Sequence, residues 1–193
     1  MPSSRPRPPR LRASASIAAA GVLAFALSGC VTAPTPTATP SPSSPAEPIF
    51  ASDKEALAAA LEAFDAYSQA SAQVSAGAAA PATVYRTVTP AFAETLNAEF
   101  SSLRDSGLSM LGDIRIDNAK LAESTFDENG AIVSIYFCRD VSAVRVIGAD
   151  GSDVTPADRD DRVPTHAFFV SSPDNPSVVL VDGVELWTGD DFC

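Results

Sequence analysis

Few side chains in this sequence have types and spacing suited to chemistry. Its 193 residues include one histidine, His166, and three cysteines, Cys30, Cys138 and Cys193. A catalytic triad needs a nucleophile beside a base, and a zinc site needs three or four suitable ligands. The sequence lacks the residues for either arrangement and also lacks a glycine-rich phosphate-binding loop. We therefore expect no cofactor and no metal, and we favour a non-catalytic role over an enzymatic one.

The single histidine lies in an apolar segment, THAFFV, which has the composition of a strand. A lone histidine on a strand is more often structural than a general base. If a pocket lies between helices and sheet, we expect its lining to include Tyr85, Tyr136, His166 and Phe168. The alternative is that these aromatic side chains belong to the core.

The first cysteine follows a segment typical of exported proteins. Residues 1–12 are basic and rich in proline, and residues 17–27 are an apolar run, IAAAGVLAFAL. A membrane-spanning helix needs roughly 20 apolar residues, so this run is too short to remain as an anchor. A basic start, a short apolar run and small residues after it predict a signal peptide over residues 1–29.

The residues Leu27-Ser28-Gly29-Cys30 resemble the lipobox of bacterial lipoproteins. In that family the signal peptide is cut before the cysteine, whose sulfur carries the lipid. The resemblance implies lipidation of Cys30 and attachment to the outer face of the cell membrane. Two acyl chains suffice for stable anchoring, because each buried methylene contributes about 0.8 kcal/mol. The alternative is an ordinary signal peptide with an incidental cysteine.

The composition divides the remaining chain in two. Residues 30–48 comprise Cys30 and a linker of mainly Pro, Thr, Ser and Ala, which cannot build a core. In a polyproline II conformation this linker would reach about 55 Å, at ~3.1 Å per residue. Residues 49–193 are then expected to form a single globular domain, held away from the bilayer by the linker.

The charge of the chain argues against nucleic acid as a partner. There are 13 basic and 24 acidic residues, which give a net charge of −11. Four of the arginines precede Cys30 and no acidic residue does, so the mature chain would carry 9 basic and 24 acidic residues, or −15. Such a surface repels phosphate backbones. The expected partners are the membrane, through the lipid, and a protein of the cell envelope.

The two remaining cysteines, Cys138 and Cys193, are expected to form a disulfide, because extracytoplasmic thiols usually pair. The closed loop would contribute roughly 4 kcal/mol in the chain-entropy model. A metal pair or a redox pair is the alternative, but neither a CxxC spacing nor a histidine cluster supports it.

The first part of the domain has helical patterns. Ser52 followed by Glu55 has the form of a capping box, and apolar residues at helical spacing continue to about Val74, before Gly77. A short helix is expected over residues 81–88. Thr89-Pro90 then reads as an N-cap and a first-turn proline of a helix that ends near Gly107.

The second part has the alternating pattern of strands. Strands are expected over residues 114–121, 131–139, 144–146, 165–171 and 178–187, with a hairpin turn at Asn129-Gly130. Helices followed by an antiparallel meander predict an α+β fold. We expect two to three N-terminal helices packed on a curved antiparallel sheet of four to five strands, a cone-shaped α+β roll.

This order of elements is similar to the nuclear-transport-factor-two-like (SnoaL-like) cone fold. The lipobox, the linker and the segments FASDKEAL, CRDVSAVRV, DVTPADRDDRVP and WTGDDFC also resemble uncharacterised lipoproteins of high-GC Gram-positive bacteria. The resemblance covers most of residues 30–193 and brings no activity with it. The wider fold includes enzymes and non-catalytic interaction domains, so it cannot choose between them.

An acidic loop is the remaining candidate for a cation site, with carboxylates at Asp150, Asp153, Asp158, Asp160 and Asp161. It lacks the ligand spacing of a calcium loop and contains Arg159. We expect a solvated loop with some ion pairs. The sequence as a whole predicts a membrane-anchored extracytoplasmic binding or scaffolding module. A small cone-fold enzyme or a carrier for an apolar small molecule is the alternative.

Overall fold

A computed structural model describes residues 48–193, so the predictions for the signal peptide, Cys30 and the linker as far as residue 47 lie outside the described residues. Three helices come first in the described chain: α1 (Asp53–Ser75), the 3-10 helix η1 (Pro81–Arg86) and α2 (Pro90–Asp105). Among residues 48–193, no helix has the length and apolar character needed to cross a membrane.

The helix boundaries follow from the predicted caps. At the start of α1, the Glu55 N–H donates to Ser52 Oγ over 3.3 Å, and the Ala51 N–H donates to the Glu55 carboxylate over 3.0 Å. Beyond the ends of α1 and α2, Gly77 and Gly107 adopt φ values of 74° and 68°. These values lie in the left-handed region that glycine adopts without steric cost, so the predicted helix ends are confirmed.

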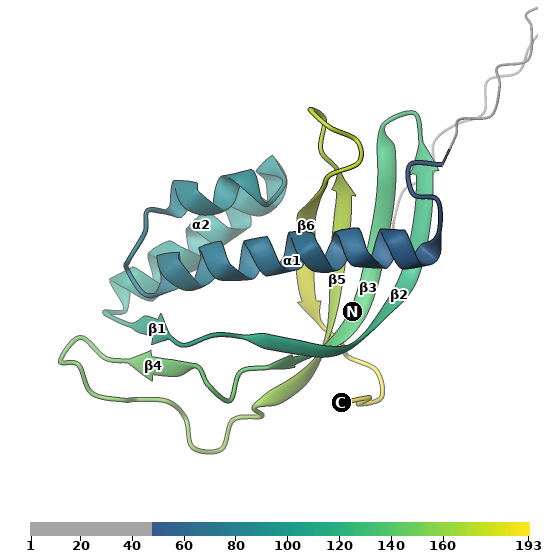
Figure 1. Cartoon of the computed structure of the whole chain (residues 1–193). Coiled ribbons are helices and arrows are strands. Elements are labelled where there is room, and N and C mark those ends of the chain that lie inside the picture. The colour runs from purple at the N-terminus through teal and green to yellow at the C-terminus, as the bar shows by residue number, and fades with distance from the viewer. Residues whose placement is uncertain (1–47) are drawn as a thin grey trace, which may run out of the picture. The chain divides into compact units, whose positions relative to one another are not determined.

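Six strands form two antiparallel sheets in the described chain. The larger sheet has the order β2 (Arg115–Asp127), β3 (Gly130–Asp140), β5 (Arg162–Ser171) and β6 (Val179–Leu186). The smaller one pairs β1 (Ser109–Leu111) with β4 (Arg145–Ile147) beyond one end of the larger sheet (Figure 1). The α+β prediction is confirmed.

Three features of the sheets differ from the sequence prediction, the first being β1, where no strand was expected. β2 continues to Asp127, six residues past the expected end, because its polar outer half still pairs with β3 as far as the hairpin. The segment around Val146 joins β1 instead of the main sheet. At the hairpin itself Gly130 is required, because a Cβ there would lie 2.4 Å from the Cβ of Ser171.

The core lies between α1 and one face of the larger sheet, which α1 crosses (Figure 1). Alternation along β3 turns Val133, Ile135 and Phe137 toward the helix, and all three are fully buried. Phe64 of α1 packs on Phe137 with the ring centroids 4.6 Å apart. Small residues Ala56 and Ala60 let the helix approach the sheet closely.

The start of α2 is attached to the edge strand β6. The Thr89 N–H donates to the Val181 carbonyl over 2.9 Å, and the Val181 N–H donates to the Thr87 carbonyl over 3.0 Å. The Thr89 hydroxyl donates to Asp182 over 2.7 Å and accepts from the Phe92 N–H over 3.2 Å, so it also caps α2. This edge attachment, formed by Thr87, Thr89, Val181 and Asp182, determines where α2 begins relative to the sheet.

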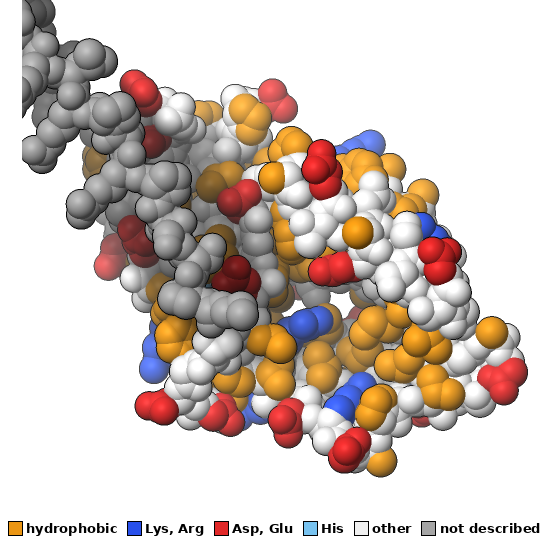
Figure 2. All heavy atoms as spheres, turned by 180° about the vertical axis from the view of Figure 1, so that it is seen from behind, with side chains coloured by type: hydrophobic (Ala, Val, Ile, Leu, Met, Phe, Trp, Pro, Cys, Tyr) orange, Lys and Arg blue, Asp and Glu red, His pale blue; other side chains and the backbone are white. Residues whose placement is uncertain are grey.

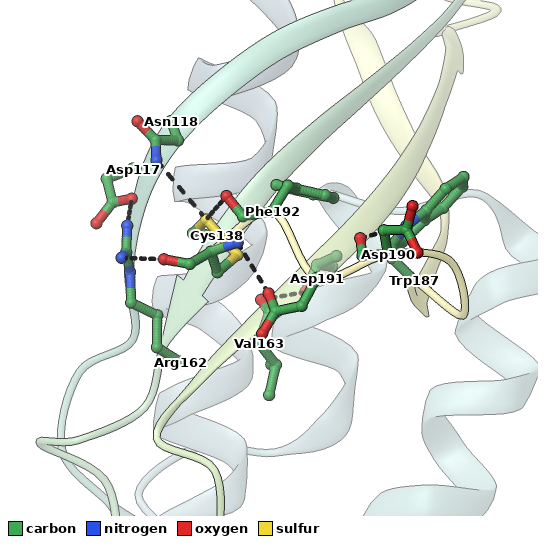
Figure 3. Close-up of a disulfide and its surroundings, with 11 residues drawn as sticks. Asp117, Asn118, Cys138, Arg162, Val163, Trp187, Asp190, Asp191 and Phe192 are labelled. Carbon is green, nitrogen blue, oxygen red and sulfur yellow. Dashed lines mark hydrogen bonds and ion pairs between the residues drawn. A yellow bond between two sulfur atoms is a disulfide. The ribbon is translucent and has the colours of Figure 1, made fainter.

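On the other face of the sheet lies the carboxy-terminal segment, residues 187–193, held by a disulfide between Cys138 and Cys193 (Figure 3). Arg162 reinforces this position, because its guanidinium donates to the Cys193 carbonyl over 2.6 Å and pairs with Asp117. Trp187 packs edge-on against Tyr136, with the ring centroids 4.9 Å apart. The last residues therefore cover part of a sheet face that would otherwise be solvated.

The edge attachment can be tested by removing its hydroxyl. Thr89→Val is expected to lower the free energy of unfolding by about 1–2 kcal/mol, because α2 loses its cap and Asp182 loses a hydrogen bond. Thr89→Ser retains the hydroxyl, so its free energy of unfolding should decrease by only a small part of this amount. Urea denaturation of both variants measures the difference. Equal stability of Thr89→Val and the wild type would contradict the role assigned to the hydroxyl.

Candidate ligand-binding cleft

A cleft of about 320 Å³ lies where α1, α2 and the end of the larger sheet meet. Its walls come from the second half of α1, from α2, from β1 and from the ends of β3 and β6. The lining residues are Tyr67, Ser71, Ser75, Phe92, Leu96, Glu99, Phe100, Leu103, Met110, Arg139 and Val184. Seen from behind, the molecule is hollowed, with hydrophobic, basic and acidic side chains at the edge of the hollow (Figure 2). The volume is at the lower end of the range for small-molecule sites, which is roughly 300–1,000 Å³.

Arg139 is the cationic side chain of the cleft. It follows Ile135 and Phe137 at alternate positions of β3, so it lies on the face of the strand that α1 covers. Its side chain is partly buried, and within residues 48–193 it makes no hydrogen bond and no ion pair. Its guanidinium nitrogens are open to the cleft, because within residues 48–193 the buried side-chain polar atom without a partner is His166 Nε2.

The other arginines of the strands and of the acidic loop are paired. Arg115 lies 3.9 Å from Asp140, Arg145 lies 3.6 Å from Asp153, and Arg159 lies 2.7 Å from Asp161. Arg162 pairs with Asp117. In a chain with almost twice as many acidic as basic residues, partners for arginine are abundant. Arg86 and Arg104 also form no ion pair, but both are exposed, so among the arginines of residues 48–193 Arg139 is the one that is partly buried without an ion pair.

Tyr67 brings a phenol group to the same space. A series of ring contacts positions it: Phe64 lies 5.7 Å from Tyr67, and Tyr67 lies 5.8 Å from Phe92, measured between ring centroids. Burial raises the pKa of the Tyr67 phenol, while Arg139 acts to lower it and Glu99 to raise it. The phenol is therefore neutral at physiological pH and can donate a hydrogen bond.

The polar side chains of the cleft differ in how deeply they are buried. Arg139, Tyr67, Ser71 and Ser75 are partly buried, whereas Glu99 on α2 is exposed. Apolar side chains of α2 and β6 form the opposite wall, with Leu96 and Phe100 buried. The arrangement can hold a small molecule with one polar end and one apolar part.

Other hollows in the described chain lack a partly buried arginine without an ion pair, including one of about 360 Å³ between η1 and α2 that is mainly apolar and lined by Tyr85, Pro90 and Ala93. One of about 410 Å³, beside Asp65, Gln69 and Asp113, presents two carboxylates without a cation. Another of about 200 Å³ lies along α1 beside Ala63 and Arg86. It is smaller than most ligand sites. We therefore take the cleft with Arg139 as the candidate site.

The side chains predicted to line a pocket lie elsewhere. Tyr136, His166 and Phe168 come together on the face of the sheet opposite α1, whereas the sequence analysis expected them between helices and sheet. The reason is strand alternation: Phe137 and Ala167 occupy the core-facing positions, so their neighbours point the other way. Tyr85 is 42% exposed on η1 and lies apart from them, where it lines a separate hollow beside α2.

His166 is enclosed by aromatic rings. It stacks on Tyr136 at 4.2 Å and lies 4.1 Å from Phe168, measured between ring centroids. Its Nε2 atom is buried and has no hydrogen-bond partner among the described residues. Burial lowers the pKa of His166, and the nearby Glu185 opposes this effect. The neutral ring is thus the form that the folded protein favours.

The acidic loop uses its carboxylates for local turns. Asp150 accepts hydrogen bonds from Ser152, and Asp153 accepts one from the Thr155 N–H over 2.9 Å. These hydrogen bonds lower the pKa values of Asp150 and Asp153. No cluster of three or more potential metal ligands occurs within residues 48–193.

Sequence reasoning missed Arg139, Tyr67 and Glu99 as site residues. A signal for one of them was present, because Arg139 is a charged residue at a core-facing position of the most apolar strand. Tyr67 falls within the apolar helical pattern that the sequence predicts as far as about Val74, and this pattern marks it as a packing residue. The contribution of Glu99 depends on where α2 lies relative to β3, which the helix pattern does not encode.

Comparison with known proteins adds no family. No protein-family model matches the chain, and no curated protein is similar to it. The candidate site therefore rests on the geometry of the chain itself.

The enclosure of His166 leads to a pH-dependent stability. Because the folded-state pKa lies below the unfolded value near 6.5, the unfolded chain binds the proton first as the pH falls. Stability from this group is complete above that value and is lost as the pH decreases toward the folded pKa. His166→Phe retains the ring contacts and removes the titration. Urea denaturation at about pH 7.5 and about pH 5.5 should show a smaller loss in the variant than in the wild type. Equal losses would contradict this assignment.

Proposed function

We propose that the protein is a lipid-anchored module of the cell envelope that binds a small molecule in the cleft between α1, α2 and the sheet. The observation that carries the proposal is the unpaired Arg139 in a cleft that also presents a buried apolar wall. Ligand sites typically combine apolar surface with a few placed polar groups, and the cleft has this composition.

Binding explains the cleft better than catalysis does. Its polar side chains are a guanidinium, a phenol, two serine hydroxyls and an exposed carboxylate. These groups can hold and orient a ligand. The histidine, which is the usual general base, lies on the other face of the sheet against Tyr136. Of the alternatives that the sequence leaves open, the cleft favours a carrier of a small molecule.

The placement at the membrane rests on the lipobox-like residues that end at Cys30. A proline-rich linker between this cysteine and the domain would let the cleft face the extracytoplasmic space. We also propose that the domain is a nuclear-transport-factor-two-like cone. The helices before a curved antiparallel sheet, with a cleft at its end, support this proposal.

Anchoring is tested by Cys30→Ser expressed in a high-GC Gram-positive host. Without the sulfur the thioether cannot form, so the variant should move from the membrane fraction to the soluble fraction or retain its signal peptide. Cys193→Ser makes the same chemical change elsewhere and should remain at the membrane. Mass spectrometry of the mature amino terminus checks the modification. A Cys30→Ser protein that matures and fractionates like the wild type would overturn the placement.

Occupancy of the cleft is tested with octanol as a neutral apolar probe in NMR titrations of the folded chain. Octanol should shift resonances of residues that line the cleft, such as Leu96 and Val184. Ser71→Phe fills the cleft and should abolish these shifts, whereas Gln73→Phe, on an exposed position of α1, should preserve them. Shifts that survive in Ser71→Phe, or shifts absent from the wild type, would contradict a ligand site in the cleft.

A further inference from the structure

The charge of the cleft narrows the class of its ligand. Arg139 is partly buried and lacks a partner among residues 48–193, although carboxylates are abundant in the chain. Guanidinium groups present a planar set of donors that matches a carboxylate, and they bind it through two parallel hydrogen bonds. The unmet donors of Arg139 are therefore suited to an anion that comes from outside the chain.

Neighbouring groups favour a carboxylate over other head groups. The Tyr67 phenol lines the same cleft beside the Ser71 hydroxyl and can donate a further hydrogen bond to an anion. Burial keeps the pKa of Tyr67 raised, so the phenol retains its proton at neutral pH. One guanidinium balances a single negative charge, which disfavours a phosphate or a dicarboxylate in so acidic a protein.

Glu99 is the carboxylate of the cleft, and it does not neutralise Arg139. The two side chains form no ion pair. Glu99 is exposed, so water screens its charge, and its effect on a bound ligand is weaker than that of the partly buried guanidinium. This difference favours an anionic ligand over a cationic one, because a cation would meet Arg139 at the inner part of the cleft.

We infer that the cleft binds a small monocarboxylic acid with an apolar body, whose carboxylate pairs with Arg139 and whose body packs on Leu96, Phe100 and Val184. The inference rests on the proposed function, because it names the class of ligand for the same site.

The test uses three probes that share one apolar chain: octanoate, octanol and octylammonium. Their dissociation constants are measured by NMR titration or calorimetry at low salt. In the wild type, octanoate should bind at least about tenfold more tightly than octanol, because a hydrogen bond to a charged group contributes about 1.5–3 kcal/mol. Octylammonium should bind more weakly than octanol, because its charge is repelled by Arg139.

Variants assign the preference to one side chain. Arg139→Gln should weaken octanoate binding to the level of octanol and leave octanol binding unchanged. Arg139→Lys retains the charge but loses the paired donors, so an intermediate affinity is expected. Arg104→Gln removes an arginine of α2 that bonds Ser101 outside the cleft, and it should alter none of the three affinities.

The outcomes separate this inference from the proposed function. Equal binding of octanoate and octanol to the wild type, or a preference for octylammonium, would overturn the carboxylate assignment while a small-molecule site stands. A preference for octanoate that persists in Arg139→Gln would overturn the role of Arg139. Failure of all three probes to bind would overturn the proposed function and the inference together.

Discussion

The attachment of α2 to the edge of β6 is the constraint on which the candidate site depends. Backbone hydrogen bonds between Thr87, Thr89 and Val181 make the chain before α2 a short extension of the sheet. The helix therefore starts at the sheet edge, while α1 alone crosses the sheet face. A helix that lay beside α1 on the sheet would fill the space above the end of β3. The edge position leaves this space open, and the open space is the cleft.

The two faces of the sheet have different roles because strand alternation separates their residues. The face toward α1 carries Val133, Ile135 and Phe137, which build the core, and then Arg139, which enters the cleft. The opposite face carries Tyr136, His166 and Phe168, whose rings contact one another and, through Tyr136, the ring of Trp187. The disulfide at Cys138 holds the end of the chain over this second face. The disulfide therefore fixes the chain end to β3 on one face of the sheet, while the same strand presents Arg139 on the other face.

Within residues 48–193, the cleft differs from the rest of this acidic protein in containing a partly buried arginine without a carboxylate partner. Arg115, Arg145, Arg159 and Arg162 are matched with aspartates at or near the surface, where water screens ion pairs and their net contribution is small. Arg139 is partly buried in the cleft and has no partner within residues 48–193, so its guanidinium is free to bind an anion that enters. Arginines therefore have two different roles in this protein. Four of those at or near the surface form weak ion pairs with aspartates, whereas the partly buried Arg139 is left to bind an anion.

The amino-acid sequence by itself determined the helices and the four strands of the larger sheet, although it did not predict β1. Local signals are sufficient for this, because the hydroxyls of Ser52 and Thr89 cap helices, glycines end them, and alternation marks strands. Only the tertiary structure decided which strand face the helices cover and where α2 lies. Both depend on contacts between residues far apart in the chain, such as Thr89 with Asp182. For this reason the aromatic residues that the sequence assigned to a pocket lie outside it, and the site is built around an arginine that the sequence pattern left unremarked.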